Sequence, residues 1–376
     1  MTKPENKKKQ NLILDGHKLA WHRERLEAWL AGERIAPITI DCALTRRCTY
    51  NCVYCYSKLQ IHDEQKMTRD VIFRFLDDAA EIGVKAISFV SDGESTCSPH
   101  LEDSILRGKA NGLDMALGTN GYLLKIDRLE EILPALTYLR FNFSAGEPEA
   151  YSKVMGCRIE AYYRVIEIIK ECVRIKRKKN LSVTLGLQMV LLPEYENQII
   201  PLARLGKKLG VDYTVIKHCS DDELHTLGVD YSKYFTMGDT LREAESYSTD
   251  DYLVKAKWSK IMSGGTRKYS RCYGAPFMPQ FSGSGLVAPC GMLFNSRYAE
   301  KFHIGNIIDT PFKEIWKSKR YWEVMDYLAS DKFDARTDCA CLCLQHKINE
   351  FLWDLKNGDI SLDEPAGEPP DHINFI

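Results

Sequence analysis

The sequence predicts an α/β protein, a partial (β/α)6 TIM-type barrel followed by a small cysteine-rich extension. Short apolar runs rich in β-branched residues alternate with amphipathic stretches between residues 36 and 220. Such alternation indicates parallel strands joined by right-handed crossovers. It gives six units, fewer than the eight of a closed barrel, so we expect an open one. Five cysteines then gather between residues 272 and 343.

The predicted elements follow one another in β/α order. The apolar runs predict strands at residues 37–44, 85–90, 113–119, 138–144, 181–192 and 211–219. The amphipathic stretches predict helices at residues 68–83, 98–112, 127–136, 159–180 and 196–210. In parallel α/β proteins the chemistry lies beyond the carboxyl ends of the strands. We therefore expect functional side chains in the loops that follow these strands.

The barrel core occupies residues 36–220, and composition divides the rest of the chain into four segments. They are an N-terminal segment at 1–35, a polar, aromatic-rich connector or lid at 221–265, the cysteine-rich extension at 266–352 and a tail at 353–376. The tail is rich in proline and acidic residues, so we expect it to lie extended over the surface.

Composition excludes several classes of protein. The net charge is −1 over 376 residues, so overall charge gives no case for nucleic acid, although a local basic groove is possible. Neither a membrane-length apolar run nor a secretory signal is present, which favours a cytoplasmic protein. In a reducing compartment, thirteen cysteines favour metal or redox roles over disulfides.

Three cysteines lie close together in the stretch "CTYNCVYC", directly after the first predicted strand. Cys48, Cys52 and Cys55 are separated by three residues and then by two. Iron–sulfur clusters are held by cysteine thiolates, and three thiolates on a four-iron cluster leave one iron open to another ligand. A structural zinc site normally takes four ligands, and no fourth lies nearby. The spacing therefore favours an iron–sulfur cluster.

This cysteine spacing, with Tyr54 before the last cysteine, resembles that of the radical S-adenosylmethionine (SAM) superfamily. The stretch "SDGESTCSP" after the second predicted strand resembles the GGEP motif of that family. Glu94 would accept hydrogen bonds from the ammonium of SAM, and Gly93 would let the backbone approach. Asp92 and Ser95 depart from the motif, which weakens the argument for the loop's geometry.

Two further loops extend the resemblance over about residues 36–220. "GTNG", with Asn120, resembles the segment near the SAM ribose, and "FNFSAGEPEAY" resembles the end of the fourth strand, where Ser144 would face the ribose or carboxylate. The resemblance implies that a [4Fe–4S] cluster reduces SAM to methionine and a 5′-deoxyadenosyl radical, which abstracts a hydrogen atom from the substrate. It also implies an electron donor such as flavodoxin or ferredoxin.

The later cysteines resemble a second kind of iron–sulfur domain. "GNIIDTPFKEIWKS" and "CACLCLQHKINEFL" resemble the SPASM and twitch extensions of radical SAM enzymes, which carry auxiliary clusters. The full SPASM pattern has seven cysteines, so five indicate one auxiliary [4Fe–4S] cluster and a twitch-like form. Its ligands would be Cys272, Cys290 and two of Cys339, Cys341 and Cys343, with Cys339 and Cys343 favoured. The alternative is a structural zinc ribbon.

The last predicted strand supplies two candidate catalytic residues. Side chains alternate along "DYTVIKHCSD", so Lys217 and Cys219 share one face of this strand. If that face points into the barrel, Lys217 would pair with a carboxylate or phosphate, and Cys219 would donate a hydrogen atom to a product radical.

Several functions are compatible with the sequence. The first is hydrogen abstraction from a peptide or an amino-acid-bearing substrate, because SPASM-like extensions most often accompany peptide chemistry. The second is a redox-neutral rearrangement of a modified nucleoside or base in DNA, for example an aminoacylated thymidine. The third is a dehydrogenase or epimerase of a sugar or cyclitol. A non-catalytic iron–sulfur scaffold is the alternative of a different class.

Overall fold

The computed structural model describes residues 11–61, 65–339 and 343–376 of the chain. Its strands form one ten-stranded sheet in the order β10-β9-β8-β1-β2-β3-β4-β5-β6-β7. The strands are β1 Thr39–Cys42, β2 Ala86–Phe89, β3 Asp114–Thr119, β4 Leu136–Asn142, β5 Thr184–Leu191, β6 Tyr213–His218, β7 Leu253–Ala256, β8 Gln280–Phe281, β9 Leu286–Ala288 and β10 Gly305–Asn306.

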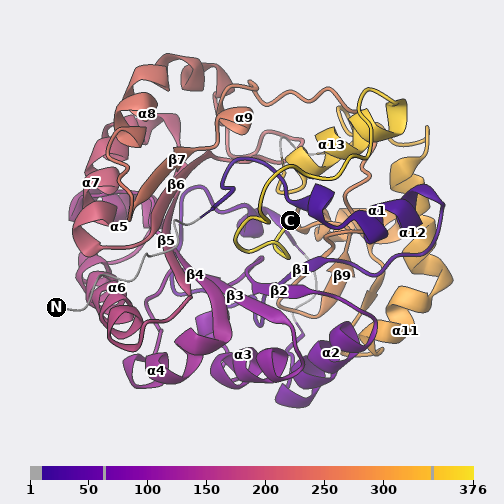
Figure 1. Cartoon of the computed structure of the whole chain (residues 1–376), viewed down its shortest axis with the longest axis horizontal. Coiled ribbons are helices and arrows are strands. Elements are labelled where there is room, and N and C mark those ends of the chain that lie inside the picture. Colours follow the sequence, from indigo (N-terminus) through magenta and orange to yellow (C-terminus); the bar gives the residue numbers. More distant parts are fainter. Residues whose placement is uncertain (1–10, 62–64, 340–342) are drawn as a thin grey trace.

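Helices cover the outer face of this curved sheet (Figure 1). They are α1 Arg23–Leu30, α2 Arg69–Glu81, α3 Leu101–Ala110, α4 Leu129–Ile132, α5 Pro148–Met155, α6 Ile159–Lys179, α7 Ile199–Leu209, α8 Gly238–Glu245, α9 Trp258–Ile261, α10 Ala299–Phe302, α11 Phe312–Lys317, α12 Lys319–Ala329 and α13 His346–Asn357.

The predicted partial barrel is confirmed. Strands β1 to β7 are parallel, and each pairs with the next along the chain. The six predicted strands correspond to β1 to β6. On the other side of β1 lies β8, which is also parallel to it, while β9 and β10 continue antiparallel. Within the described residues β7 and β10 remain the two edges, so the barrel is open.

Local sequence explains why the barrel helices form where they do. In α2 the Thr68 side chain accepts a hydrogen bond from the Val71 amide at the first turn. The buried side chains Ile72, Phe75, Leu76 and Ala79 follow helical spacing and face the sheet. The chain leaves the helix through the turn at residue 83. Amphipathic spacing and capping therefore place α2 directly after the cysteine loop.

Residues 221–265, which we expected to be a connector or lid, contain α8 and β7. Strand β7 extends the barrel because Tyr213 of β6 pairs with Leu253 and Ile216 pairs with Ala256. Helix α8 packs on β7 and α7. The sequence did not reveal β7 because its residues LVKA include a lysine and follow the polar, acidic stretch 245–251, so no long apolar run marks the strand.

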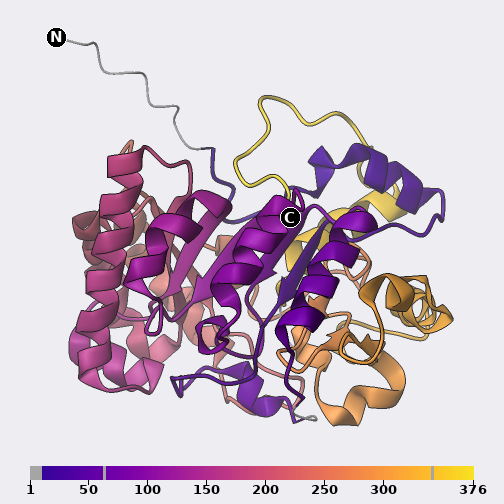
Figure 2. The ribbon, with the colours of Figure 1, turned by 90° about the horizontal axis from the view of Figure 1, so that it is seen from below.

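The expectation that the tail lies over the surface is wrong for its last residues. Phe375 is buried and packs edge-on against Tyr138 of β4, with ring centroids 4.9 Å apart. His372 lies 2.8 Å from the Thr184 hydroxyl, and the Lys18 ammonium donates to the Phe375 carbonyl at 2.7 Å. Figure 2 shows the yellow tail returning to one end of the barrel. The apolar last residues of the tail pack into that end of the barrel. We did not expect this because the stretch before them is acidic and rich in proline.

No helix in the described part of the chain has both the length and the apolar character needed to cross a bilayer.

Candidate active site and auxiliary cluster site

The first cysteine group lies in the loop between β1 and α2, at the carboxyl end of the barrel strands. Burial raises the pKa of the Cys48 thiol to about 11 and that of the Cys52 thiol to about 12, and nearby Cys55 contributes to both shifts. The Tyr50 amide donates to Cys48 Sγ at 3.4 Å, and Ser57 Oγ lies 3.0 Å from Cys55 Sγ. The loop therefore gathers the three thiols and supplies polar partners for two of them.

Helix α5, which the sequence did not predict, anchors this loop. The Asn51 amide donates to the Gly156 carbonyl at 3.2 Å, and the Val53 amide donates to the Val154 carbonyl at 3.0 Å. Gly156 caps α5 at φ 58° in the left-handed region, and a Cβ there would lie 2.1 Å from the Asn51 carbonyl oxygen. Glycine at 156 is therefore needed both for the turn and for the contact with the cysteine loop.

The Glu94 carboxylate lies buried at the carboxyl ends of β2 and β3. Its Oε1 accepts hydrogen bonds from the Thr119 hydroxyl at 2.6 Å and from the amide and hydroxyl of Thr96. Its Oε2 accepts one from the Asn120 amide at 2.7 Å. Protein donors hold the carboxylate in place, and Oε2 has capacity for one further donor. Asn120 in turn donates from Nδ2 to Thr49 Oγ1 at 3.1 Å and to Cys48 Sγ at 3.9 Å.

Gly93 and Asp92 join this loop to other parts of the protein. A Cβ at Gly93 would lie 1.8 Å from the Thr45 carbonyl oxygen. Because glycine has no side chain, the backbone at Thr45 can pack directly against Gly93. Asp92, the departure from the motif, accepts from the Ser282 hydroxyl at 2.7 Å and the Gly283 amide at 2.9 Å. This pair lies just after β8. Asp92 thus ties the Glu94 loop to the start of the cysteine-rich extension.

Tyr54 and Ser144 contact each other. The buried Ser144 hydroxyl donates to Tyr54 Oη at 2.9 Å and accepts from the Val190 amide at 3.2 Å, while Tyr54 Oη donates to Met155 Sδ at 3.0 Å. Ser144 is therefore committed to the protein. Cys219 is also buried, and its Sγ lies 4.0 Å from the Tyr54 carbonyl oxygen, beside the cysteine loop.

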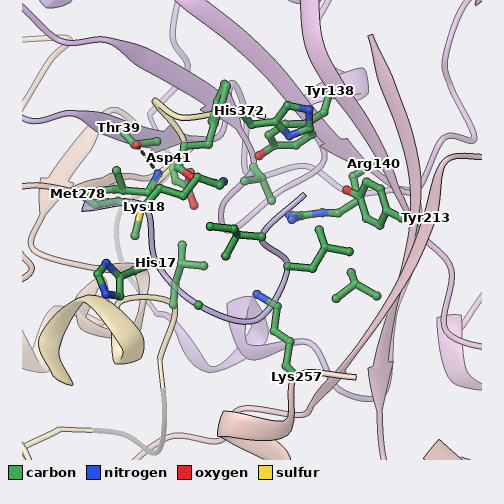
Figure 3. Close-up of a pocket in the computed structure, with 18 residues that line it drawn as sticks. His17, Lys18, Thr39, Asp41, Tyr138, Arg140, Tyr213, Lys257, Met278 and His372 are labelled. Carbon is green, nitrogen blue, oxygen red and sulfur yellow. Dashed lines mark hydrogen bonds between the residues drawn. The ribbon is translucent and has the colours of Figure 1, made fainter. Parts of the chain in front are cut away.

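The barrel encloses a cavity of about 130 Å³ below these loops (Figure 3). Tyr213 and Val215 of β6 line it, so the face of β6 that carries Lys217 points into the barrel. Burial, with the charges of Arg140 and Lys260, lowers the pKa of Lys217 to about 7. Sequence analysis missed Arg140, which lines the cavity; a charged residue within an apolar strand was the available signal.

The second cysteine group surrounds an apolar cavity in the extension. Cys272, Cys290, Cys339 and Cys343 line it, with Tyr269, Leu293, Leu328 and Phe333 among the other walls. Burial raises the pKa of Cys272 to about 12, with further contributions from Cys343 and Cys339. The structure therefore brings together the four residues that the sequence favoured. Cys341 lies outside the described residues.

Side chains from α13 hold this cavity together. Gln345 Nε2 donates to the Met278 carbonyl at 2.7 Å and to the Pro289 carbonyl at 2.9 Å. Asn349 Nδ2 donates to Cys272 Sγ at 3.6 Å. Donors at the sulfur of a cluster ligand tune its reduction potential. These contacts fix the cysteine-bearing segments around one centre.

The donor sets fit the groups that the sequence implies. Four thiols lining one apolar cavity match the four cysteine ligands of a [4Fe–4S] cluster, and three thiols in one loop match a cluster with an open iron. Thiolates that share one zinc lie about 2.3 Å from it. Four cysteine thiolates can also hold a structural zinc ion, so the second donor set fits the zinc alternative as well.

Comparisons with known sequences agree with these sites. The model of the radical SAM superfamily matches residues 43–205, and that of the SPASM iron–sulfur cluster-binding domain matches residues 280–343. The chain is 22% identical over 311 residues to the tungsten-containing aldehyde ferredoxin oxidoreductase cofactor-modifying protein of Pyrococcus furiosus, covering 79% of this chain and 85% of that protein.

Two other relatives carry different names. The chain is 25% identical over 303 residues to the GTP 3′,8-cyclase of Aquifex aeolicus, covering 74% of this chain and 88% of the relative. It is 30% identical over 136 residues to the PqqA peptide cyclase of Bradyrhizobium diazoefficiens, covering 36% of this chain and 35% of the relative. Relatives with such different substrates leave the substrate of this chain open.

The fold is shared with solved structures. SuiB of Streptococcus suis bound to S-adenosylmethionine superposes with a TM-score of 0.62 at 16% identity, covering 82% of this chain and 72% of SuiB. SuiB bound to its precursor peptide SuiA superposes with a TM-score of 0.60 at 14% identity, covering 82% and 71%. Residues 43–205 thus match the radical SAM domain, which binds SAM at a [4Fe–4S] cluster, and residues 280–343, after the barrel, match a SPASM-type iron–sulfur cluster-binding domain.

Proposed function

We propose that this enzyme abstracts a hydrogen atom from a peptide or an amino-acid-bearing substrate held inside the barrel. Cys48, Cys52 and Cys55 would hold the cluster that binds SAM, with Glu94 and Asn120 beside it. When bound and reduced by a donor such as flavodoxin or ferredoxin, that cluster supplies the electron that cleaves SAM to methionine and a 5′-deoxyadenosyl radical.

The observation that carries this proposal is the cavity inside the barrel, whose lining includes residues close in the chain to both cysteine groups. At one side the cavity is lined by Val90, two residues before Asp92 and the Glu94 loop. At another it is lined by Met278 and Leu344, which lie beside the second cysteine group. A substrate in this cavity is enclosed by the barrel, and the walls exclude the water that would compete for a radical.

The residues of β6 have proposed roles in this arrangement. Lys217 points into the barrel on the same face as Val215 but does not line the cavity, so we propose that its amine meets the part of the substrate that extends beyond the cavity. Cys219 lies two residues further on, next to the cysteine loop, where its thiol can donate a hydrogen atom to a product radical. Cys272, Cys290, Cys339 and Cys343 would hold the auxiliary cluster.

Two relatives support a peptide over other substrates. One is named for a peptide, the PqqA peptide cyclase, and SuiB has been solved with its precursor peptide. A nucleoside or nucleotide is the second candidate, because cationic side chains line the cavity and one relative is a GTP 3′,8-cyclase.

Transfer of deuterium to SAM-derived 5′-deoxyadenosine tests the proposal. The anaerobically reconstituted enzyme is given SAM, reductant and either peptides deuterated at carbon or deuterated nucleosides, and the product is analysed by mass spectrometry. We expect deuterium from the peptide pool. Deuterium only from nucleosides would make the second candidate correct, and no 5′-deoxyadenosine at all would refute both.

A variant with Cys48, Cys52 and Cys55 all changed to Ala is the matched control. We expect about eight irons per chain in the wild type and about four in the variant, as two four-iron clusters require. The variant should form no 5′-deoxyadenosine while keeping the auxiliary iron. A wild type with about four irons, all lost in the variant, would contradict an auxiliary cluster.

A further inference from the structure

The barrel cavity contains more positive than negative charge. Arg140 of β4 and Lys257, directly after β7, point into it from two walls (Figure 3). Asp41 of β1 is the one acidic residue among those that line it. Burial raises the pKa of Asp41 to about 7, so near neutral pH only part of this carboxyl is ionised. Burial, with the charges of Lys260, Lys217 and Arg140, also lowers the pKa of Lys257 well below its usual value, and an anion bound beside it would favour the ammonium form.

Among residues 11–61, 65–339 and 343–376, the Arg140 guanidinium and the Lys257 ammonium have no hydrogen-bonding partner. Arg140 Nε is buried without an acceptor, and the contact described for the guanidinium is with the Tyr138 ring, at 5.7 Å from its centroid. In the described part of the chain neither Arg140 nor the Lys257 ammonium makes a hydrogen bond or an ion pair. The Asp41 carboxylate instead accepts from Gln280 Nε2 at 3.3 Å.

Arg140 and Lys257 are partly buried, and Arg140 Nε is fully removed from water, so leaving these groups unpaired carries a cost. A buried cation is normally paired, because removal from water costs several kcal/mol unless another charge compensates. Lys176, by contrast, is largely buried and is paired with Asp212 at 2.5 Å. The unpaired cations of the cavity are therefore placed for a negative group that enters with the ligand.

We propose that Arg140 and Lys257 bind an oxyanion of the substrate, a carboxylate or a phosphate, inside the barrel. This inference rests on the proposed function, because it assumes that the cavity receives the substrate. The planar guanidinium of Arg140 presents two parallel N–H groups to such a group, and the Lys257 ammonium adds a point charge. The bound anion would orient the rest of the substrate toward the cysteine loop.

Anion binding to the reconstituted protein tests the proposal without turnover. Inorganic phosphate and acetate are titrated calorimetrically at constant ionic strength into the wild type, Arg140→Met and Lys257→Met. Lys255→Met is the matched control, because Lys255 lies two residues away, is 36% exposed and pairs with Glu245 at 3.1 Å. We expect at least tenfold weaker binding in the two cavity variants and unchanged binding in the control.

The preferred probe identifies the source of the anion. Tighter phosphate binding indicates a phosphorylated substrate, and tighter acetate binding indicates a carboxylate of a peptide or amino acid. Either result supports the binding of an oxyanion by Arg140 and Lys257. Failure of the wild type to bind both probes, or equal binding by the cavity variants, would overturn the proposal.

Stability separates a ligand site from a structural one. Without anion, Arg140→Met should melt at the same temperature as the wild type or higher, because the change removes an unpaired buried charge. A lower melting temperature together with unaltered phosphate and acetate binding would show that Arg140 serves the fold. Formation of 5′-deoxyadenosine without substrate tests the proposed function separately, so either proposal can fail alone.

Discussion

The two cysteine groups are built in opposite ways. The first has three cysteines within eight residues of one loop, and Cys48 is exposed. The second has four cysteines from three stretches of the chain, which line one apolar cavity. Three thiols leave one iron of a four-iron cluster open to a further ligand, whereas four thiols leave none. The difference indicates that the first site reacts and that the second braces the fold or carries electrons.

The two regions nevertheless form one continuous structure. Strand β8 pairs with β1, so the extension begins inside the barrel sheet. Gln280 of β8 donates to Asp41 in the barrel and accepts from the Gly291 amide, next to Cys290. Asp92 adds a second link through Ser282 and Gly283. A change in one region can therefore be tested for its effect on the other.

The largest difference between the regions should appear in stability. Cys290 is 7% exposed and lines the auxiliary cavity, so Cys290→Ala should remove the auxiliary iron and lower the free energy of unfolding by several kcal/mol, as loss of a structural metal site does. Cys48→Ala should instead remove the other iron with little change in stability. Iron analysis and thermal melting of both variants measure this contrast.

Cys172→Ala is the matched control for this comparison. Cys172 is fully buried in α6, away from both cysteine groups, and its loss should cost only about 1–2 kcal/mol. If Cys290→Ala melts like this control and keeps all its iron, Cys290 is not a ligand and the contrast between the two regions fails.

The sequence predicted the features that depend on residues close together in the chain. The spacing of Cys48, Cys52 and Cys55 and the alternation of strands and helices are local patterns, so the barrel and the family could be predicted. The grouping of Cys272, Cys290, Cys339 and Cys343 came from resemblance, and the structure places these four around one cavity.

Contacts between distant residues were not predictable in this way. Asp92 looked like a defect in the motif because its partner Ser282 lies 190 residues further along the chain. The contact of Ser144 with Tyr54 joins two loops that lie 90 residues apart in the chain. Arg140 could be recognised as a cavity residue only from its position in the folded barrel. Each of these side chains depends on tertiary packing that one sequence does not show.

The next contrast concerns the anchor of the first site. Gly156→Ala would place a Cβ 2.1 Å from the Asn51 carbonyl in a backbone with φ 58°, so the cysteine loop must move. We expect loss of about half the iron and at least a tenfold fall in 5′-deoxyadenosine formation, with the auxiliary iron retained. Iron analysis and product assay of the reconstituted variant check this expectation.

Gly112→Ala provides the control, because Gly112 has φ 81° but no atom lies within 4 Å of an added Cβ. It should cost about 1–2 kcal/mol of backbone strain and leave iron and turnover unchanged. Equal losses in both variants would mean that strain alone, rather than the contact with Asn51, causes the effect of Gly156→Ala.

The smallest effect concerns Asp41, which lies between the two regions. Burial raises its pKa from 3.8 to about 7, against the lowering influence of Arg140, Gln280 and Lys217. Because the folded pKa exceeds the unfolded one, the stability contributed by the protonated carboxyl is complete below pH 3.8 and is lost as the pH rises to about 7. Asp41→Asn keeps a neutral side chain at every pH and avoids this loss.

The melting curves of Asp41→Asn and the wild type should therefore diverge between pH 5 and pH 8. The variant should gain up to about 3 kcal/mol relative to the wild type over this range, since one pKa unit corresponds to about 1.4 kcal/mol. Asp77→Asn is the control, because Arg107 lowers the pKa of the Asp77 carboxyl, so its titration lies below this range. Parallel curves for Asp41→Asn would mean that Asp41 stays charged in the fold. It would then serve Arg140 and Lys257 as a permanent counter-ion, and the barrel cavity would lose its excess of positive charge.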